Sequence, residues 1–248
     1  MFHEGARRSP LSLARPSTGG SFFARVFPLR PRGREPEREI RRRYDRLARI
    51  YDRRWASYVE ASVRETLKRV DLAGAREVLD VGCGTGTLLE AASSEMPAAR
   101  LAGVDLSPGM LAVARRKLGH RATLVAGSAE RLPFRSRRFD VVLSASALHF
   151  WRDPSAALSE IHRVLRPRGR IAITDWCANG WIDRLRDLVL RRVEPAHFRV
   201  YRTWELAAML TAAGFDDVRV ERYRIGPRWG LMTGVATVSA GWPGAAPM

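Results

Sequence analysis

The sequence predicts an α/β fold with a doubly wound, mostly parallel sheet, and three observations lead to that prediction. Short apolar runs rich in valine, leucine and isoleucine recur along the chain, with helix signals between them. The first of these runs passes directly into a glycine-rich turn and then into a helix pattern. With 248 residues, the chain is also long enough to bury a full α/β core.

The chain becomes helical from about residue 37, because apolar residues recur there at three- and four-residue steps. These residues are Ile40, Tyr44, Leu47 and Tyr51. A second helix is expected over residues 56–70. Both helices precede the first strand of the sheet.

Strands and helices then alternate to the end of the chain. Parallel strands are predicted near residues 77–81, 101–105, 122–126, 139–144 and 170–175. Ser107 and Asp153 are predicted N-caps, because a proline follows each of them at the first helical position. Thr203 is predicted to cap a helix that stops at Gly214. Two further strands are expected over 217–225 and 229–238.

The most informative stretch is VLDVGCGTGTLL, residues 78–89. Gly82, Gly84 and Gly86 allow a tight turn whose peptide groups stand open to a bound molecule, since glycine tolerates positive φ and has no Cβ. Asp80, just inside the strand end, suits a cationic or amino-bearing ligand better than a pyrophosphate. The spacing G-x-G-x-G also differs from the dinucleotide pattern G-x-G-x-x-G. The turn therefore predicts a nucleoside ligand without phosphates.

A second acid belongs to the same arrangement. Asp105 ends the apolar run LAGVD, 19 positions after Gly86, about where nucleoside-binding α/β folds place an acid for ribose hydroxyls. Ligands of open α/β sheets collect beyond the carboxyl ends of the strands. The glycine turn, Asp105, residues 128–130 and residues 144–151 are therefore expected to form one cleft.

On these residues the chain resembles the class I S-adenosylmethionine-dependent methyltransferases, whose first motif is an acid followed by G-x-G-x-G and whose second strand ends in an acid. Three later segments resemble the family's adenine-contacting segment, fourth strand and fifth strand, in the family's order. They are VAGSAERLPF (125–134), FDVVLSASALHFW (139–151) and LRPRGRIAITDW (165–176). The resemblance covers roughly residues 76–176. It implies a Rossmann-like, seven-stranded, mostly parallel sheet with an antiparallel last strand, helices on both faces, and S-adenosyl-L-methionine as cofactor.

The resemblance also implies which residues bind the cofactor: Asp80, Gly82, Cys83, Gly84, Gly86, Asp105, Leu106, Ser128, Ala129, Glu130 and Ser144. Within this set, Cys83 is interpreted as a small packing residue of the glycine turn. The family's third motif usually carries an acid where this chain has Ser128. The contact to the adenine amino group is therefore expected from the Ser128 hydroxyl, from Glu130 or from the backbone of Ala129.

The segment YDRLARIYD (44–52) and the LPF after the third strand resemble one branch of the family. That branch contains ubiquinone and menaquinone C-methyltransferases and bacterial phospholipid N-methyltransferases, and the resemblance implies a small or lipid-like acceptor. It also places residues 44–52 over the cofactor pocket. Tyr44 and Tyr51 either close on the methionine end of the cofactor or on the acceptor, or simply pack their helix on the domain.

Methyl transfer from a sulfonium is an in-line displacement, so the protein chiefly aligns the nucleophile and excludes water. A base is needed only where the acceptor must lose a proton. His149, just beyond the fourth strand, is the candidate base, and the alternative is that it walls the pocket. His197 is a second candidate. Trp176 and Trp181 follow the fifth strand, where they either favour a flat or lipophilic acceptor or anchor a loop.

The net charge of +17 indicates an anionic partner. Thirteen arginines and five acids lie in the first fifty residues, and the first 36 hold five prolines. Residues 1–36 are therefore interpreted as a flexible basic arm. Its segment SFFARVFPLRPR (21–32) favours peripheral contact with an anionic membrane surface, with a disordered tail or an organellar presequence as the alternatives.

Residues 37–248 are expected to form one methyltransferase domain, with a helical cap at 37–70, a cofactor-binding core at 76–176 and C-terminal helices and a hairpin at 177–248. The two cysteines, Cys83 and Cys177, cannot build a disulfide framework, and their sequence contexts do not indicate a metal site. The longest apolar stretches fall far short of the roughly 20 residues that cross a bilayer. A cytoplasmic location is expected, with peripheral membrane contact through the arm.

Three rival functions remain open at this point. The first is an RNA methyltransferase that uses its arginines on phosphates, although charge alone supports it. The second is a module that kept the cofactor pocket but lost the chemistry. The third is an NAD-dependent oxidoreductase, which the glycine spacing disfavours.

Overall fold

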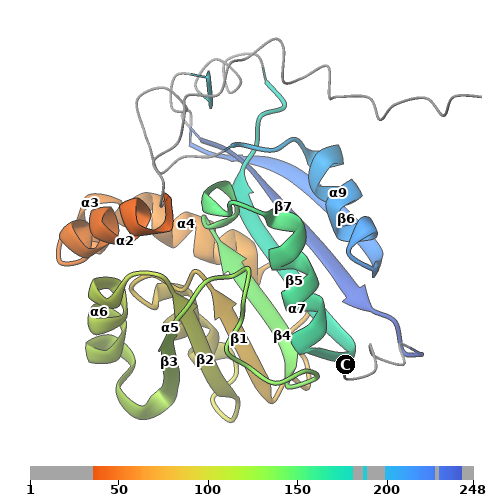
Figure 1. Ribbon diagram of the computed structural model, residues 1–248, viewed down its shortest axis with the longest axis horizontal. Helices are drawn as coiled ribbons and strands as arrows, with labels where there is room; N and C mark the ends of the chain where they lie inside the picture. The colour runs from red at the N-terminus through yellow and green to blue at the C-terminus, as the bar shows by residue number, and fades with distance from the viewer. Residues whose placement is uncertain (1–35, 181–186, 189–198, 227–228, 242–248) are drawn as a thin grey trace, which may run out of the picture. The chain divides into compact units, whose positions relative to one another are not determined.

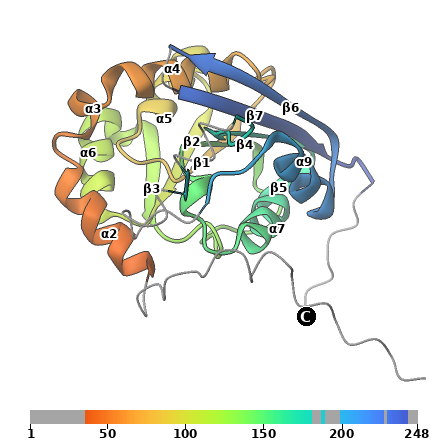
Figure 2. The same ribbon diagram turned by 90° about the horizontal axis from the view of Figure 1, so that it is seen from above.

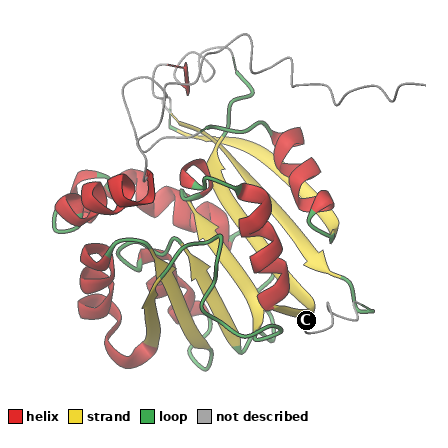
Figure 3. Ribbon diagram, viewed as in Figure 1, coloured by secondary structure: helices red, strands yellow, loops and turns green. Residues whose placement is uncertain are grey.

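The computed structural model describes residues 36–180, 187–188, 199–226 and 229–241, which all belong to one structural unit, Gly33–Met248. The basic arm up to residue 35, Trp181 and His197 lie outside the described residues. A seven-stranded sheet forms the centre of this unit, with helices on both of its faces (Figures 1 and 3). Its strands are β1 (Glu77–Val81), β2 (Arg100–Asp105), β3 (Ala122–Ala126), β4 (Phe139–Ala145), β5 (Leu165–Trp176), β6 (Phe215–Ile225) and β7 (Trp229–Val238).

The strand order is β3-β2-β1-β4-β5-β7-β6. The first five strands pair in parallel, and β7 lies antiparallel between β5 and β6. This confirms the predicted Rossmann-like sheet with an antiparallel last strand. The largest difference at a strand boundary is in β5, which begins five residues earlier than the predicted 170, while the other strand ends agree within two residues. Leu165 already pairs with Phe139, and a bulge then shifts the register before Val141 meets Arg170.

The helices are α2 (Pro36–Leu47), α3 (Tyr51–Arg54), α4 (Ala56–Leu67), α5 (Thr87–Glu95), α6 (Pro108–Leu118), α7 (Pro154–Val164) and α9 (Thr203–Ala212). Both predicted proline-adjacent caps are confirmed. Ser107 Oγ accepts a hydrogen bond from the Met110 amide at 3.1 Å, and Asp153 Oδ1 accepts one from the Ala156 amide at 3.0 Å. The predicted cap at Thr203 is wrong by one residue. Arg202 is the N-cap, because its amide donates to the Glu205 carboxylate three residues later.

Helices α7 and α9 cover one face of the sheet, and α4, α5 and α6 cover the other (Figure 2). A hydrophobic cluster lies under each set, as the twofold side-chain period of a strand requires: in β1, Leu79 belongs to the cluster under α7 and α9, and Val78 to the other. The inner face of α7 is fully buried, with Ala157, Leu158, Ile161 and Val164 at 0 % exposure. Because both faces are covered, a ligand has access mainly at the ends of the strands.

In the part of the chain that the structure describes, no helix combines the length and apolar character needed to span a bilayer. The described residues also contain no group of three or more histidine, cysteine or acidic side chains arranged to hold a metal ion.

Candidate cofactor and acceptor site

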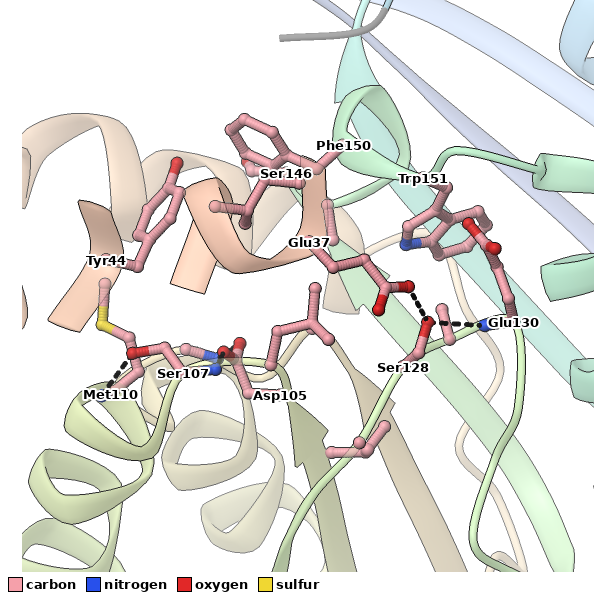
Figure 4. Close-up of a pocket in the computed structure, with 18 of the residues that line it drawn as sticks. Glu37, Tyr44, Asp105, Ser107, Met110, Ser128, Glu130, Ser146, Phe150 and Trp151 are labelled. Atoms are coloured by element: carbon pink, nitrogen blue, oxygen red, sulfur yellow. Dashed lines mark hydrogen bonds between the residues drawn. The ribbon is translucent and has the colours of Figure 1, made fainter. Parts of the chain in front are cut away.

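A cavity of about 790 Å³, its open mouth included, lies beyond the carboxyl ends of β1, β2, β3 and β4 (Figure 4). Helices α2 and α3, which precede the first strand in the sequence, cover this cavity. Nine residues of the predicted site line it: Tyr44, Tyr51, Gly82, Gly84, Asp105, Leu106, Ser128, Ala129 and Glu130. The structure thus brings together the glycine turn, the second acid and the segment after β3 in one cleft.

The glycine turn needs glycine at each of its three positions. Gly82, Gly84 and Gly86 have φ values of 76°, 51° and 81°, a region that other residues seldom adopt. A Cβ on Gly82 would lie 2.5 Å from the Ala147 Cβ, so packing also excludes a side chain there. A Cβ on Gly84 would meet no described atom within 4 Å, and it would point into open space. Gly84 therefore leaves room for a ligand to approach the backbone.

Asp105, at the end of β2, is fixed by the backbone around it. Its Oδ2 accepts from the Gly84 amide and its Oδ1 from the Ser107 amide, both at 2.8 Å. Burial raises the pKa of Asp105, and these two amide hydrogen bonds oppose the rise. Each carboxylate oxygen can accept a second hydrogen bond, so Asp105 can bind two neighbouring hydroxyl groups of a ribose at the cavity wall.

Asp80 is buried behind the turn, with 1 % of its surface exposed, and it does not line the cavity directly. Neither of its oxygens has a hydrogen-bond partner in the described structure. Burial raises the pKa of Asp80 well above its usual value, and the nearby Asp105 charge raises it further. A buried acceptor pair of this kind is costly unless a donor satisfies it, so Asp80 fits an amino-bearing ligand better than a phosphate.

The other predicted members of the cofactor set lie behind the cavity wall. The Cys83 thiol is buried, and burial raises its pKa well above the usual range. Gly86 is the N-cap residue of α5. Ser144 donates a hydrogen bond to the Val81 carbonyl at 2.7 Å and so ties the end of β4 to the end of β1. These three residues support the turn, and none of them is among the residues that line the cavity.

At the β3 side of the cavity, Glu130 is occupied by backbone donors. Its Oε1 accepts from the amides of Arg152 and Asp153 at 2.8 and 2.9 Å. Ser128 Oγ instead donates to Oε1 of Glu37 at 3.0 Å and accepts from the Glu130 amide at 3.3 Å. Glu37 comes from α2, and both the cavity lining and Figure 4 include it. This contact joins residues 91 positions apart, so no period or spacing in the sequence predicts it.

Comparison with known proteins agrees with this geometry. A family model described as a methyltransferase domain matches residues 79–173. The demethylmenaquinone methyltransferase of Thermus thermophilus is 31% identical over 229 residues, which cover 82% of this chain and 97% of that protein. The chain belongs to the class I S-adenosylmethionine-dependent methyltransferases. Within them it lies in the branch of the demethylmenaquinone methyltransferases.

Other matches are shorter or show the fold alone. The demethylmenaquinone methyltransferase of Chlorobaculum tepidum is 42% identical over 103 residues, which span 41% of this chain and 42% of that protein. Among solved structures, a possible histamine N-methyltransferase of Thermotoga maritima has a TM-score of 0.65 at 23% identity, covering 78% of this chain and 97% of that one. A phosphoethanolamine N-methyltransferase of Haemonchus contortus, solved with S-adenosylmethionine, has a TM-score of 0.60 at 20% identity, covering 71% and 52%.

Two aspartates of the YDRLARIYD segment tie α2 and α3 to the cavity end of the sheet. Asp45 Oδ1 accepts from Ser107 Oγ at 2.6 Å and from the Gly109 amide at 2.8 Å. Asp52 accepts from Thr85 Oγ1 in the glycine turn at 2.5 Å and from Lys117 at 2.9 Å. The sequence pattern did not predict these contacts.

Tyr44 and Tyr51 lie where α2 and α3 meet the cavity. They line the cavity, and their rings pack 6.0 Å apart, with Tyr44 edge-on to Phe150 at 5.4 Å. Burial and then the Asp105 charge raise the pKa of Tyr51 to about 12, so its hydroxyl stays protonated near neutral pH. In its protonated form this hydroxyl can donate a hydrogen bond.

At the other end of the cleft, a chain of side chains leads away from Ser146, which lines the cavity. Tyr58 Oη lies 2.6 Å from Ser146 Oγ and accepts from Trp176 Nε1 at 2.8 Å. Trp176 stacks on Trp229 with 5.5 Å between ring centroids, and Tyr58 packs against the same indole at 5.1 Å. Burial and the charge of Asp175 raise the pKa of Tyr58. This aromatic wall, formed by Tyr58, Trp176 and Trp229, combines residues of α4, β5 and β7, and it adjoins the cavity through Ser146 without being among the lining residues.

His149 lies next to this wall, buried to 3 % exposure, and it is not among the residues that line the cavity. Its Nδ1 is 2.7 Å from Asp175 Oδ1, and its amide donates to Asp175 Oδ2 at 3.0 Å. The ring stacks on Trp176 at 4.5 Å and 9°. A carboxylate beside Nδ1 holds the proton on that nitrogen and makes Nε2 the basic one.

Proposed function

We propose that this methyltransferase binds its cofactor with the glycine turn, Asp80 and Asp105, and that it transfers the methyl group to a small, flat, lipid-like acceptor. Residues 37–70 act as the cap, 76–176 as the cofactor-binding core, and 177–248 complete the sheet and the acceptor side. The observation that carries the acceptor class is the aromatic wall formed by Tyr58, Trp176 and Trp229. Two stacked indoles and a phenol suit a planar ring better than a charged, flexible amine.

The cofactor, when bound, supplies a methyl group already activated by a sulfonium. The residues present fit its nucleoside part. Gly84 leaves the backbone accessible, Asp105 presents carboxylate oxygens for ribose hydroxyls, and Asp80 carries two unsatisfied oxygens suited to an amino group. The protein then has to align the acceptor and exclude water from the site. The cap helices α2 and α3 contribute to both by covering the cavity.

The relatives support a phenol-like acceptor. The similar proteins of Thermus thermophilus and Chlorobaculum tepidum are named demethylmenaquinone methyltransferases, and we infer a quinol ring as the acceptor class here. A quinol becomes a stronger nucleophile when it loses a proton. His149, with its Nδ1 held by Asp175, is the base that we propose for this step.

We also propose peripheral contact with an anionic membrane, where a lipid-like acceptor would be found. The support within the described residues is a set of exposed arginines: Arg42 and Arg46 in α2, Arg49 in the turn after it and Arg53 in α3. Arg42 and Arg46 are four residues apart and share one side of α2, opposite Ile40 and Tyr44. Several basic residues near a surface give a salt-sensitive attraction to acidic lipids.

The test is an acceptor panel with the purified chain and S-adenosylmethionine, with release of S-adenosylhomocysteine as the readout. The panel contains a demethylated menaquinol, phosphatidylethanolamine in vesicles and a structured RNA. Turnover with the quinol that is at least about tenfold above the other two supports the proposal. Turnover with RNA alone, falling steeply with salt, would replace it with the nucleic-acid alternative.

A further inference from the structure

We propose that Glu37 of the cap helix supplies the carboxylate that binds the amino group of adenine, so that α2 is part of the cofactor's base pocket. This inference rests on the proposed placement of the cofactor in the cavity. It assigns a specificity role to a residue outside the sequence motifs of the core.

The position of the base follows from the strand order. Asp105 ends β2, and β3 is the next strand outward, so a ribose held at Asp105 directs its base either toward the segment after β3 or back across β1. The wall toward β3 offers apolar contacts from Leu106, Met110 and Ile40, which suit the faces of a purine. The polar groups at its rim are Ser128, Glu130 and Glu37 (Figure 4).

Of these three, Glu37 is the residue whose carboxylate points toward Ser128 and the base pocket, whereas the carboxylate of Glu130 lies beside Trp151 (Figure 4). An exocyclic amino group has two hydrogens to donate and needs acceptors. Glu130 Oε1 already accepts from two backbone amides at the start of α7. The single Ser128 proton is donated to Glu37, which holds that carboxylate at the rim of the base pocket, 3.0 Å from the serine oxygen. An anionic acceptor forms the stronger hydrogen bond.

The arrangement has a consequence for selectivity. Adenine presents an amino donor to this rim, whereas hypoxanthine presents a keto oxygen at the same position. A carboxylate repels that oxygen, so Glu37 discriminates against the deaminated nucleoside as well as binding the correct one. The residue that recognises the base belongs to α2, so base recognition also depends on where α2 is placed over the cavity.

The experiment compares the affinities of S-adenosylhomocysteine and S-inosylhomocysteine by calorimetry, for the full chain and for three variants. The full chain should prefer the adenosyl ligand by about tenfold or more. In E37Q the amide can present either its oxygen or its nitrogen, so the preference should fall to within about twofold of unity. E37Q/S128D returns an acid to the segment after β3 and should recover most of the preference.

E39Q is the matched control, because Glu39 lies in the first turn of the same helix, is exposed and does not line the cavity. It removes the same charge from the helix N-terminus and should leave the preference unchanged. An E37Q variant that keeps the full preference overturns the role of Glu37. Failure of the folded full chain to bind S-adenosylhomocysteine at all instead overturns the proposed cofactor site, so the two failures are distinguishable.

Discussion

The two ends of the cleft are built in different ways. The proposed cofactor end is formed mainly by the backbone, with three glycines of positive φ and an aspartate held by two amides. The proposed acceptor end is formed by side chains, because Ser146, Tyr58 and Trp176 meet from three separate segments of the chain. A site formed by the backbone consists of consecutive residues, so it can be recognised in a sequence. A site made of converging side chains becomes visible only in the folded chain.

Substitutions in the glycine turn test most directly whether the backbone forms the ligand site. Gly82→Ala drives a Cβ into Ala147 and should destabilise the protein by about 2–3 kcal/mol as well as abolish cofactor binding. Gly84→Ala adds a methyl group that meets no described atom within 4 Å. It should cost only about 1 kcal/mol of stability yet weaken cofactor binding by about tenfold or more. Thermal unfolding and calorimetric titration measure the two effects.

Gly226→Ala is the control for backbone strain alone. Its φ is 62°, an added Cβ meets no described atom within 4 Å, and Gly226 is not among the residues that line the cavity. It should match the stability loss of Gly84→Ala and leave binding unchanged. Equal binding by the Gly84 and Gly226 variants would mean that no ligand approaches the turn.

His149 offers the corresponding test at the acceptor end. His149→Asn removes the proposed base and should lower kcat by about 100-fold near neutral pH, with little change in the affinity for S-adenosylhomocysteine. Asp175→Asn keeps a hydrogen-bonding group beside Nδ1 but removes its charge. It should lower kcat by a smaller factor, because the imidazolium that forms on proton transfer loses its negatively charged partner. Unchanged kcat in both variants, with reduced stability, would mean that His149 and Asp175 only stabilise the fold.

The sequence and structure agree most closely where the pattern is local. The positions of β1, β3 and β7 were predicted to the residue, because runs of apolar residues and turn glycines fix them independently of the rest of the fold. The glycine turn and Asp105 were found for the same reason. The longer β5 was not, since its first residue pairs with Phe139 across a bulge.

The missed part of the site depends on contacts between distant residues. Tyr58 is 88 positions from Ser146 and 118 from Trp176, and Glu37 is 91 from Ser128. No period or spacing encodes such pairs. The serine at position 128 was a usable signal for Glu37, because its lack of a carboxylate leaves the adenine amino group in need of another acceptor.

The smallest expected effect is a pH dependence of stability that has opposite signs at the two ends of the strands. Burial raises the folded-state pKa of Asp80 above 3.8, so its protonated form contributes stability that is lost as the pH rises through the raised value. The melting temperature of Asp80→Asn should therefore exceed that of the parent by a margin that grows from about pH 4 toward neutrality.

Asp140, at the other end of the sheet, should behave in the opposite way. Its burial is outweighed by the Arg166 hydrogen bond and two backbone amides, which lower its pKa. Its ionised form therefore contributes stability that is present above 3.8 and is lost on acidification through the lowered pKa. Asp140→Asn should be less stable than the parent near neutral pH, with the deficit shrinking in acid. If the melting temperatures of both variants depended on pH in the same way, the conclusion that the Asp80 carboxyl is buried without a partner would be wrong.

The most direct test of the central claim, that the glycine turn and Asp105 bind the family's cofactor, is a calorimetric titration with S-adenosylhomocysteine. Asp105→Ala is compared with Asp140→Ala, because both wild-type carboxylates accept two backbone amides but only Asp105 lies at the cavity. We expect S-adenosylhomocysteine to bind the parent and Asp140→Ala with micromolar affinity, Asp105→Ala to lose at least about 30-fold in affinity, and NAD not to bind. Equal affinities of the two variants, or no binding by the folded parent, would contradict the claim that the turn and Asp105 bind the cofactor.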